Sequence, residues 1–377
     1  MKKYKLFYLL IPFLILVFIL AIEIISLILN IKQIKTFAKK LAIDIVKNQP
    51  QNFDNNFSDW QKQTMKLTNK INKFAFIKKI LPKKYYKQIN QAKCLLDTIA
   101  ELNNYLPKIL GKDKLKTYFI LLQNNLELRP SGGFMGSYAK IKFKNGAMEK
   151  LTINDIYVPD GQLIGHVDPP WPIQTAFKQG WWKLRDSNWK PDFPESAKQI
   201  QWFFSKGNEE QSDGIIAINF LVVKDLLKII GPLKILDYNY NINADNFYQI
   251  TQNEVENNFF PGSTQKKDFL GAITKYLILK LEKTKENQLI QLIKVLKDNL
   301  NEKQILIAFN DFQLNQFFSQ LNWNGEIKRK YKDSKDIFAD YIYLVDTNLG
   351  ANKANCCVQR QVVQEINFNK NGFITCI

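Results

Sequence analysis

The sequence predicts an α/β fold, a mixed sheet flanked by helices, preceded by a transmembrane helix and a helical stalk. Three observations lead to this prediction. An almost wholly apolar run occupies residues 6–30, lysine-rich helical periodicity fills 31–110, and short apolar strands alternate with amphipathic helices from residue 117 onward. Strands that alternate with helices are typical of a sheet that helices cover on both faces. The predicted units are 1–31 (cytoplasmic tip and anchor), 32–114 (basic helical stalk), 115–325 (α/β domain) and 326–377 (strand-rich C-terminal segment).

The apolar run predicts a membrane anchor. LFYLLIPFLILVFILAIEIISLILN (6–30) follows three lysines and is long enough to cross the roughly 30 Å hydrocarbon core of a bilayer. A cleaved signal peptide is the alternative, but the run is longer than a typical signal core and no small-residue cleavage site follows it. Lysines flank both ends, so the positive-inside rule alone does not choose an orientation.

The basic charge is concentrated before the predicted sheet. Residues 1–116 hold 22 lysines against seven acidic residues, which accounts for 15 of the net charge of +18. Such a surplus of positive charge is typical of proteins that bind nucleic acid, anionic lipid or a phosphate-rich polymer. Because it adjoins the predicted anchor, the expected partners are the membrane, anionic lipid, a polyprenyl-phosphate carrier or cell-wall polymer, and not nucleic acid. The alternative is that these lysines form the solvated faces of ordinary helices.

Three strands are expected to open the sheet, at 117–125, 134–146 and 148–158. The dipeptide Asn145-Gly146 predicts a tight hairpin between the second and third strands. The connection that follows, 160–194, is long for a compact domain, and connections of that length are usually functional or disordered. Its tryptophans argue against disorder.

Helices and strands alternate through the rest of the chain. A helix is expected at 195–206, followed by a strand–helix–strand unit at 213–235. Further helices are predicted at 243–260, 266–285, 286–300 and 311–321, a strand at 304–310, and strand-like stretches at 340–348 and 356–377. The last stretch ends within a hairpin pattern, so we expect the chain to be truncated there.

A candidate anion site follows the first strand, in the sequence ELRPSGG. Pro130 restricts Arg129 to extended geometry, and arginine offers a planar fork of donors suited to phosphate. Gly132 and Gly133 would allow a ligand to approach backbone N–H groups, and Ser131 adds a hydroxyl. The alternative is an architectural turn in which Arg129 forms an ion pair with Glu127.

A second cluster of charges, LRDSNWKPDFP, lies near the end of the long connection. Arg185 has the same phosphate-binding geometry, and we expect it to converge with Arg129 on one pocket at the carboxyl edge of the sheet. Asp186, or else Asp155, would hold Mg²⁺ against the bound phosphate. The alternative is that Arg185 pairs with Asp186 and that Asp192 caps the next helix.

Tryptophans of the same connection are expected to form one wall of this pocket. They are Trp181, Trp182 and Trp189. The residues identify no catalytic group, because His166 is the only imidazole and the sequence has no phosphate-binding loop with its lysine. No cofactor other than Mg²⁺ is expected.

Four ordered motifs resemble an uncharacterised bacterial family known only as a domain of unknown function in membrane-anchored proteins. They are ELRPSGGFMGSY, the DIY…DGQ run at 155–162, LRDSNWKPDFPESA and DGIIAINFLVVKDLLKIIGPL. The resemblance covers roughly residues 85–370. A β-rich stretch generally continues further in that family, which again favours a truncated chain here.

A weaker similarity links DGIIAINFLVVKDLLKIIGPLKI (213–235) to LytR-CpsA-Psr proteins. That resemblance implies an outward-facing, membrane-anchored domain; those proteins transfer glycopolymers from a polyprenyl-pyrophosphate carrier to the cell wall with arginines and a Mg²⁺-bound aspartate. Their arginine-rich helix is replaced here by Lys266, Lys267 and Lys275 with Asp268. We therefore expect a single-pass envelope protein whose outer domain binds wall polymer or a partner without catalysis. A phosphotransferase-like enzyme, or its remnant, that binds polyprenyl-pyrophosphate-linked glycopolymer is the alternative.

Overall fold

The computed structural model describes residues 49–74, 97–257, 264–327 and 341–368, with shorter pieces between 33 and 47, at 93–94 and at 374–376. The apolar run predicted to cross the membrane lies outside these residues. Among the helices that the structure describes, none has the length and apolar character needed to cross a bilayer.

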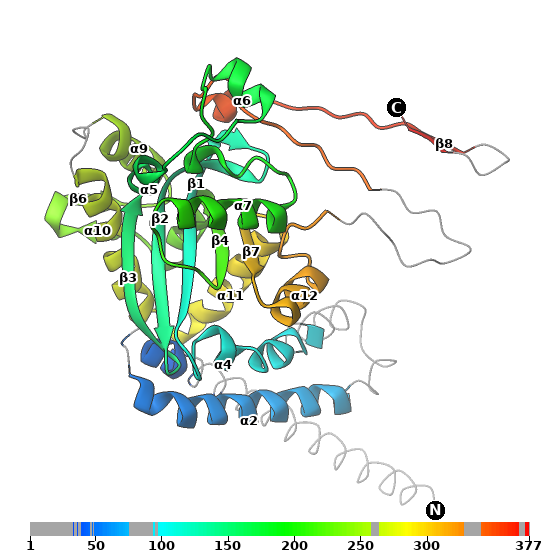
Figure 1. Cartoon of the computed structure of the whole chain (residues 1–377). Helices are drawn as coiled ribbons and strands as arrows, with labels where there is room; N and C mark the ends of the chain where they lie inside the picture. Colours follow the sequence, from blue (N-terminus) through cyan, green and yellow to red (C-terminus); the bar gives the residue numbers. More distant parts are fainter. Residues whose placement is uncertain are drawn as a thin grey trace, which may run out of the picture.

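A five-stranded mixed sheet forms the centre of the molecule, in the order β3-β2-β1-β4-β7 (Figure 1). The strands are β1 (Lys116–Arg129), β2 (Gly132–Lys144), β3 (Ala147–Asp155), β4 (Gly214–Asn219) and β7 (Ile305–Phe309). The pair β1–β4 is parallel, whereas β1–β2, β2–β3 and β4–β7 are antiparallel. The predicted mixed α/β sheet and its first three strands are confirmed.

The first strand is longer and less regular than its sequence suggested. It continues to Arg129, and its pairing with β2 shifts between Asn124 and Leu128. The residues between those two positions bulge out of the ladder. The bulge directs Glu127 and Arg129 away from the regular alternation of the strand, and this places both at the candidate site.

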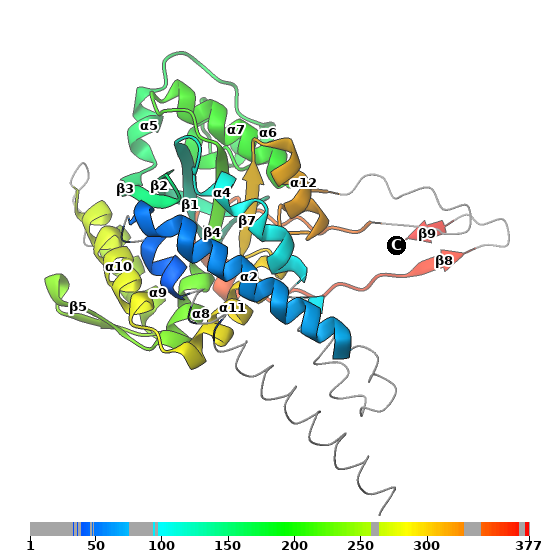
Figure 2. The ribbon, with the colours of Figure 1, turned by 90° about the horizontal axis from the view of Figure 1, so that it is seen from below.

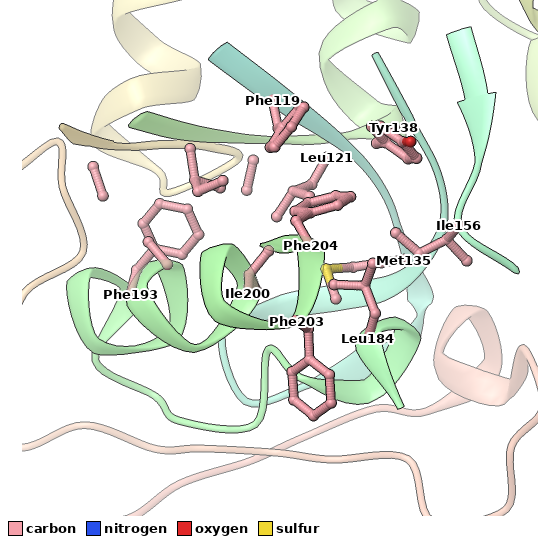
Figure 3. Packing of buried hydrophobic residues seen from close by; sticks show 14 of the residues in the cluster. Phe119, Leu121, Met135, Tyr138, Ile156, Leu184, Phe193, Ile200, Phe203 and Phe204 are labelled. Atoms are coloured by element: carbon pink, nitrogen blue, oxygen red, sulfur yellow. The ribbon is translucent and has the colours of Figure 1, made fainter. Parts of the chain in front are cut away.

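One face of the sheet is covered by α7 (Phe193–Lys206). A buried cluster joins the two, and it includes Phe119, Leu121, Met135, Tyr138, Ile200, Phe203 and Phe204 (Figure 3). Asp192 caps this helix, because its Oδ1 accepts a hydrogen bond from the backbone N–H of Glu195 at 3.1 Å. This cap belonged to the alternative interpretation of the LRDSNWKPDFP cluster.

The opposite face is covered by α8 (Phe220–Ile230), α10 (Gln265–Glu282) and α11 (Glu286–Asn301), so that helices lie on both sides of the sheet (Figure 2). A short helix, α9 (Phe247–Gln252), leads toward α10. The strand predicted near residue 233 does form, as β5 (Leu233–Ile235), but it pairs only with β6 (Tyr240–Ile242), in a separate two-stranded sheet.

The basic N-terminal helices pack across one end of the sheet, and α2 (Pro50–Phe74) crosses it in Figure 2. Phe53, Phe57 and Trp60 of α2 are buried against Leu110 and Phe143. The short helix α4 (Leu106–Ile109) and α12 (Phe312–Gln320) complete this end through a further aromatic cluster. The helical character predicted for this region is therefore confirmed where the structure describes it.

The C-terminal strands were predicted wrongly in part. Residues 341–348 are extended but belong to no sheet, and Ala354–Cys357 form a 3₁₀ turn, η5, in place of a strand. Among the C-terminal residues that the structure describes, the strands are the short β8 (Ile366–Phe368) and β9 (Ile374–Cys376), which pair with each other. An alternating apolar pattern favours extended backbone, but a sheet also requires a neighbouring strand.

The β2–β3 turn provides a test of how α2 is seated. Gly146 has a φ of +83°, and a Cβ there would collide with the ring of Phe53, whereas Gly165 has a φ of +91° and open space around it. Gly146→Ala and Gly165→Ala share the backbone strain of about 1 kcal/mol, but only the first adds overpacking of about 1–3 kcal/mol. In urea unfolding of the full chain, the free energy of unfolding should fall further for Gly146→Ala than for Gly165→Ala. Equal losses would contradict the packing of α2 on this turn.

Candidate functional site

A cavity of about 620 Å³ lies between the second face of the sheet and helices α8, α9 and α10. It opens at the carboxyl ends of the parallel pair β1 and β4, which is where ligands collect in open α/β sheets. The three helices and the stretch after α9 provide an apolar wall, formed by Phe220, Val223, Phe247, Val255, Leu270, Ile273 and Leu277. Charged side chains form one region of the remaining wall.

Arg129 is buried in that charged region with every arm of its guanidinium engaged. Its Nε and Nη2 donate to Asp186 Oδ1 at 3.1 and 2.9 Å, and Nη2 also donates to Glu127 Oε1 at 2.9 Å. Its Nη1 donates to the carbonyl of Leu128 at 3.1 Å. Phe134 and Phe177 lie beside the guanidinium, with ring centroids 5.4 and 4.9 Å from its central carbon. Arg129 therefore presents no open fork to a ligand.

Arg185 reaches the same carboxylate from the other side and is partly open to the cavity. Its Nε lies 3.6 Å from Asp186 Oδ2, its Nη1 lies 3.2 Å from Asp160 Oδ2, and 22% of its side chain is exposed. Burial raises the pKa of the Asp160 carboxyl, although Arg185 and the backbone N–H of Leu184 act in the opposite direction. The structure brings both arginines to one cavity and also contains the local ion pairs of the alternative interpretation.

Two lysines complete the cationic wall. Lys266 of α10 is buried, and its Nζ donates to the carbonyl of Gly136 at 2.6 Å and lies 3.3 Å from Asp155 Oδ2. Lys353, from the C-terminal segment, lies 3.9 Å from Glu127 Oε2. The lining thus carries four cations and two carboxylates, and two further carboxylates, Asp155 and Asp160, contact Lys266 and Arg185 from outside the lining.

The serine and the two glycines of the ELRPSGG sequence, between β1 and β2, have structural roles. Ser131 is buried, and its hydroxyl donates to the carbonyl of Asn188 at 3.1 Å. A Cβ at Gly132 would collide with the side chain of Gln123, and one at Gly133 with the backbone of Asn124. Both glycines allow β1 and β2 to approach closely, and neither lines the cavity; that they expose N–H groups to a ligand stays a prediction.

The tryptophans of the long connection do not line the cavity. Trp182 packs against the core beside α7, and its Nε1 donates to the carbonyl of Asp186 at 3.1 Å. Trp181 is half-exposed beside His166, and Trp189 is half-buried outside the cavity. The connection does contribute to the wall as expected, but through Phe177, Gln179 and the 3₁₀ turn η2 (Leu184–Asp186).

The proposed magnesium ligands are each held by cations. Asp186 contacts two guanidinium groups, and Asp155 contacts Lys266 and accepts a hydrogen bond from the backbone N–H of Tyr157 at 2.9 Å. Within the described residues, no three acidic, histidine or cysteine side chains gather as a metal site. In this arrangement the two aspartates do not fit Mg²⁺ without displacing a cation. Mg²⁺ binding stays a prediction, and no argument below uses it.

The apolar wall from α8, α9 and α10 was not predicted from the sequence. Leu270, Ile273 and Leu277 recur at three- and four-residue steps, which predicted a helix with an ordinary core-facing stripe. A stripe that lines a cavity has the same spacing as one that fills a core. Lys266 at the start of that stripe gave no signal either, because its burial is seen only in the structure.

Comparison with known families gives one match. Residues 113–255 match the model of a family described as "Protein of unknown function (DUF4012)". The resemblance to a family of unknown function is therefore confirmed over this part of the chain, which contains the first four strands of the sheet. Comparison with curated proteins gives no match.

Two crystal structures resemble this chain weakly. The Lin1025 protein from Listeria innocua shares 12% identity at a TM-score of 0.33, over 70% of this chain and 90% of its own. TagV from B. subtilis shares 12% identity at a TM-score of 0.33, over 57% of this chain and 82% of its own. Likenesses this weak carry no argument about fold or function, and the similarity to LytR-CpsA-Psr proteins stays a prediction.

The two arginines should differ in what they contribute to stability. Arg129→Met would leave Glu127 and Asp186 without the buried guanidinium that both contact, so we expect a loss of about 3–5 kcal/mol. Arg185→Met removes a partly exposed group and leaves the buried Asp160 with the backbone N–H of Leu184 as a partner, so the loss should be smaller, about 1–3 kcal/mol. Urea unfolding of the two variants would measure this, and equal losses would contradict the assignment of Arg129 as the structural partner.

Proposed function

We propose that this domain binds an amphiphile of the polyprenyl-phosphate class, with an anionic head and a long apolar chain, at the cell envelope. The observation that carries the proposal is a single cavity with a cationic region and an apolar wall. Such a cavity matches a ligand that is charged at one end only. The proposal keeps the binding role expected from the sequence and replaces wall polymer by its lipid carrier as the ligand.

The apolar wall favours a lipid over a polysaccharide. Seven large apolar side chains face the cavity from α8, α9, α10 and the stretch after α9. Each methylene of a ligand that leaves water against such a wall contributes about 0.8 kcal/mol. A hydrophilic wall polymer would gain little there and would leave its hydroxyl groups without partners. An isoprenoid or acyl chain can pack against this apolar wall along its whole length.

The cationic region favours an anionic head. Arg185, Lys266 and Tyr157 all line the cavity, and the ring centroid of Tyr157 lies 5.3 Å from the guanidinium carbon and 5.6 Å from the lysine Nζ. Burial raises the pKa of Tyr157, with Arg185 acting in the opposite direction, so its hydroxyl stays protonated at neutral pH and can donate to a phosphate oxygen. Two cations and one hydroxyl donor thus face the same space.

Binding, and not transfer, is the activity that the geometry supports best. The carboxylates of the lining, Glu127 and Asp186, are both engaged by cations and are poorly placed to act as general bases. The phosphotransferase-like alternative would use the same cavity for a polyprenyl-pyrophosphate-linked glycopolymer. Consumption of that lipid by the purified full chain, followed by mass spectrometry, distinguishes the two.

We also propose a single-pass membrane location with the sheet domain outside the cytoplasm. The apolar run at 6–30 and the adjoining lysines support an anchor close to the domain. A lipid-binding cavity near a bilayer lies close to the membrane that contains its ligand. Polyprenyl carriers and anionic lipids are therefore the expected partners.

Binding should depend on both regions of the cavity. We expect the full chain to retain labelled undecaprenyl phosphate, offered in detergent micelles, at least tenfold more tightly than undecaprenol. Arg185→Gln should remove most of this difference, because one charged hydrogen bond contributes about 1.5–3 kcal/mol. Retention of the labelled lipid on immobilised protein measures both values.

The apolar wall has a matched control on the same helix. Leu277 lines the cavity, whereas Leu279 is exposed. Leu277→Ser should weaken binding of undecaprenyl phosphate and undecaprenol alike, and Leu279→Ser should change neither. Equal affinity for the two lipids in the unaltered chain, or no effect of Leu277→Ser, would contradict the proposed function.

The location is tested by protease treatment of intact cells from which the outer layers have been removed. We expect the sheet domain to be cleaved when protease is added outside, because the domain follows a single anchor. Protection of the whole domain until the cells are lysed would place it in the cytoplasm.

A further inference from the structure

A second polar region of the cavity lies at the N-terminus of α8, formed by neutral side chains. Asn219 ends β4 and occupies the N-cap position of α8, lines the cavity and is only 5% exposed. Its Oδ1 is buried and has no hydrogen-bond partner among the described residues. A buried amide oxygen without a partner costs about 1–3 kcal/mol, so this atom calls for a donor from outside the chain.

The Asn219 side chain is held in place by its other atoms. Its Nδ2 donates to Gln304 Oε1 at 3.0 Å, and its backbone N–H donates to the carbonyl of Gln304 at 2.9 Å. Asn125 Nδ2 approaches the same Oε1 at 3.4 Å. Because Gln304 engages one polar atom of this amide, the other polar atom has no partner among the described residues. The fold therefore holds an unpaired amide group at this position.

A second unpaired acceptor faces the same cavity. Thr251 of α9 lines it, and its buried hydroxyl has no partner in the part of the chain that the structure describes. A hydroxyl can both accept and donate a hydrogen bond. The first turn of α8 adds backbone N–H groups, since no described side chain caps it. The region can thus accept and donate at once.

We propose that Asn219, Thr251 and the first turn of α8 form a subsite for a hydroxyl-bearing group joined to the anionic phosphate. The inference rests on the proposed function and adds that the head of the ligand carries hydroxyl donors. A hydroxyl group both donates and accepts, which matches what the subsite offers. A bare alkyl phosphate leaves the subsite unsatisfied, whereas a phosphodiester of a sugar or of glycerol fills it.

The test uses three probes with one chain length and one charge. They are dodecyl methyl phosphate, dodecyl glyceryl phosphate and dodecyl glucosyl phosphate, all of which carry a single negative charge on a phosphodiester. Binding to the full chain in nanodiscs is measured by calorimetry, with empty nanodiscs subtracted. We expect the two hydroxyl-bearing probes to bind about five- to tenfold more tightly than the methyl ester, the gain expected of one or two hydrogen bonds.

Two variants remove the subsite, and a third serves as the control. Thr251→Val deletes the unpaired hydroxyl at constant shape, and Asn219→Leu deletes the amide. Thr274→Val is the control, because Thr274 also lines the cavity but its hydroxyl already donates to the carbonyl of Leu270 at 2.8 Å. We expect Thr251→Val and Asn219→Leu to reduce affinity for the hydroxyl-bearing probes to that of the methyl ester, and Thr274→Val to keep the preference for the hydroxyl-bearing probes.

The outcomes separate the subsite from the function on which it rests. A glucosyl preference lost in Thr251→Val identifies a glycosyl phosphate as the ligand, and a glyceryl preference lost in the same way identifies a phospholipid head. Equal binding of all three probes, still weakened by Arg185→Gln, would overturn the subsite and leave the proposed function standing. If none of the three probes binds, both the subsite and the proposed function are contradicted.

Discussion

The buried pair between Arg129 and Asp186 is the interaction on which the candidate site depends. It joins the end of β1 to the 3₁₀ turn before α7, and Glu127 and Phe177 enclose it. Removing two charges from water is costly, and the cost is offset only when every donor and acceptor is satisfied. Arginine meets that condition because its planar fork reaches three acceptors at once, which a lysine ammonium on a flexible stem would not do in this geometry.

Both arginines contact the Asp186 carboxylate, but their guanidinium groups differ in exposure to the cavity. Arg129 is fully enclosed, so its charge is used within the protein. Arg185 takes the second oxygen of Asp186 at the longer distance of 3.6 Å and keeps part of its guanidinium exposed to the cavity. Arg129 therefore positions the carboxylate, and the carboxylate positions Arg185, whose guanidinium stays partly exposed to the cavity. The local ion pairs and the convergence of both arginines on one cavity, which seemed alternatives in the sequence, belong to the same arrangement.

Much of the sheet could be predicted from sequence, and about half of the site. The strands β1 to β3 and the turn at Asn145-Gly146 follow from local alternation and turn chemistry, which depend on neighbouring residues alone. The convergence of Arg129 and Arg185 was predictable because Arg129 lies at the carboxyl end of a strand and the connection 160–194 is long enough to reach that edge of the sheet. The apolar wall, Lys353 and the role of Gly132 depend on contacts between remote segments, and no local pattern records those.

The irregular end of β1 explains how remote segments come to share one site. A regular strand would pair its backbone with its neighbours and leave nothing for another segment to contact. Here the carbonyl of Leu128 accepts from the backbone N–H of Asn348 at 3.1 Å, and the carbonyl of Asn125 accepts from Asn355 Nδ2 at 3.0 Å. These two bonds hold the C-terminal segment against the cavity and carry Lys353 to Glu127. The bulge in β1 thus places Arg129 within the fold and also recruits a further cation from far along the chain.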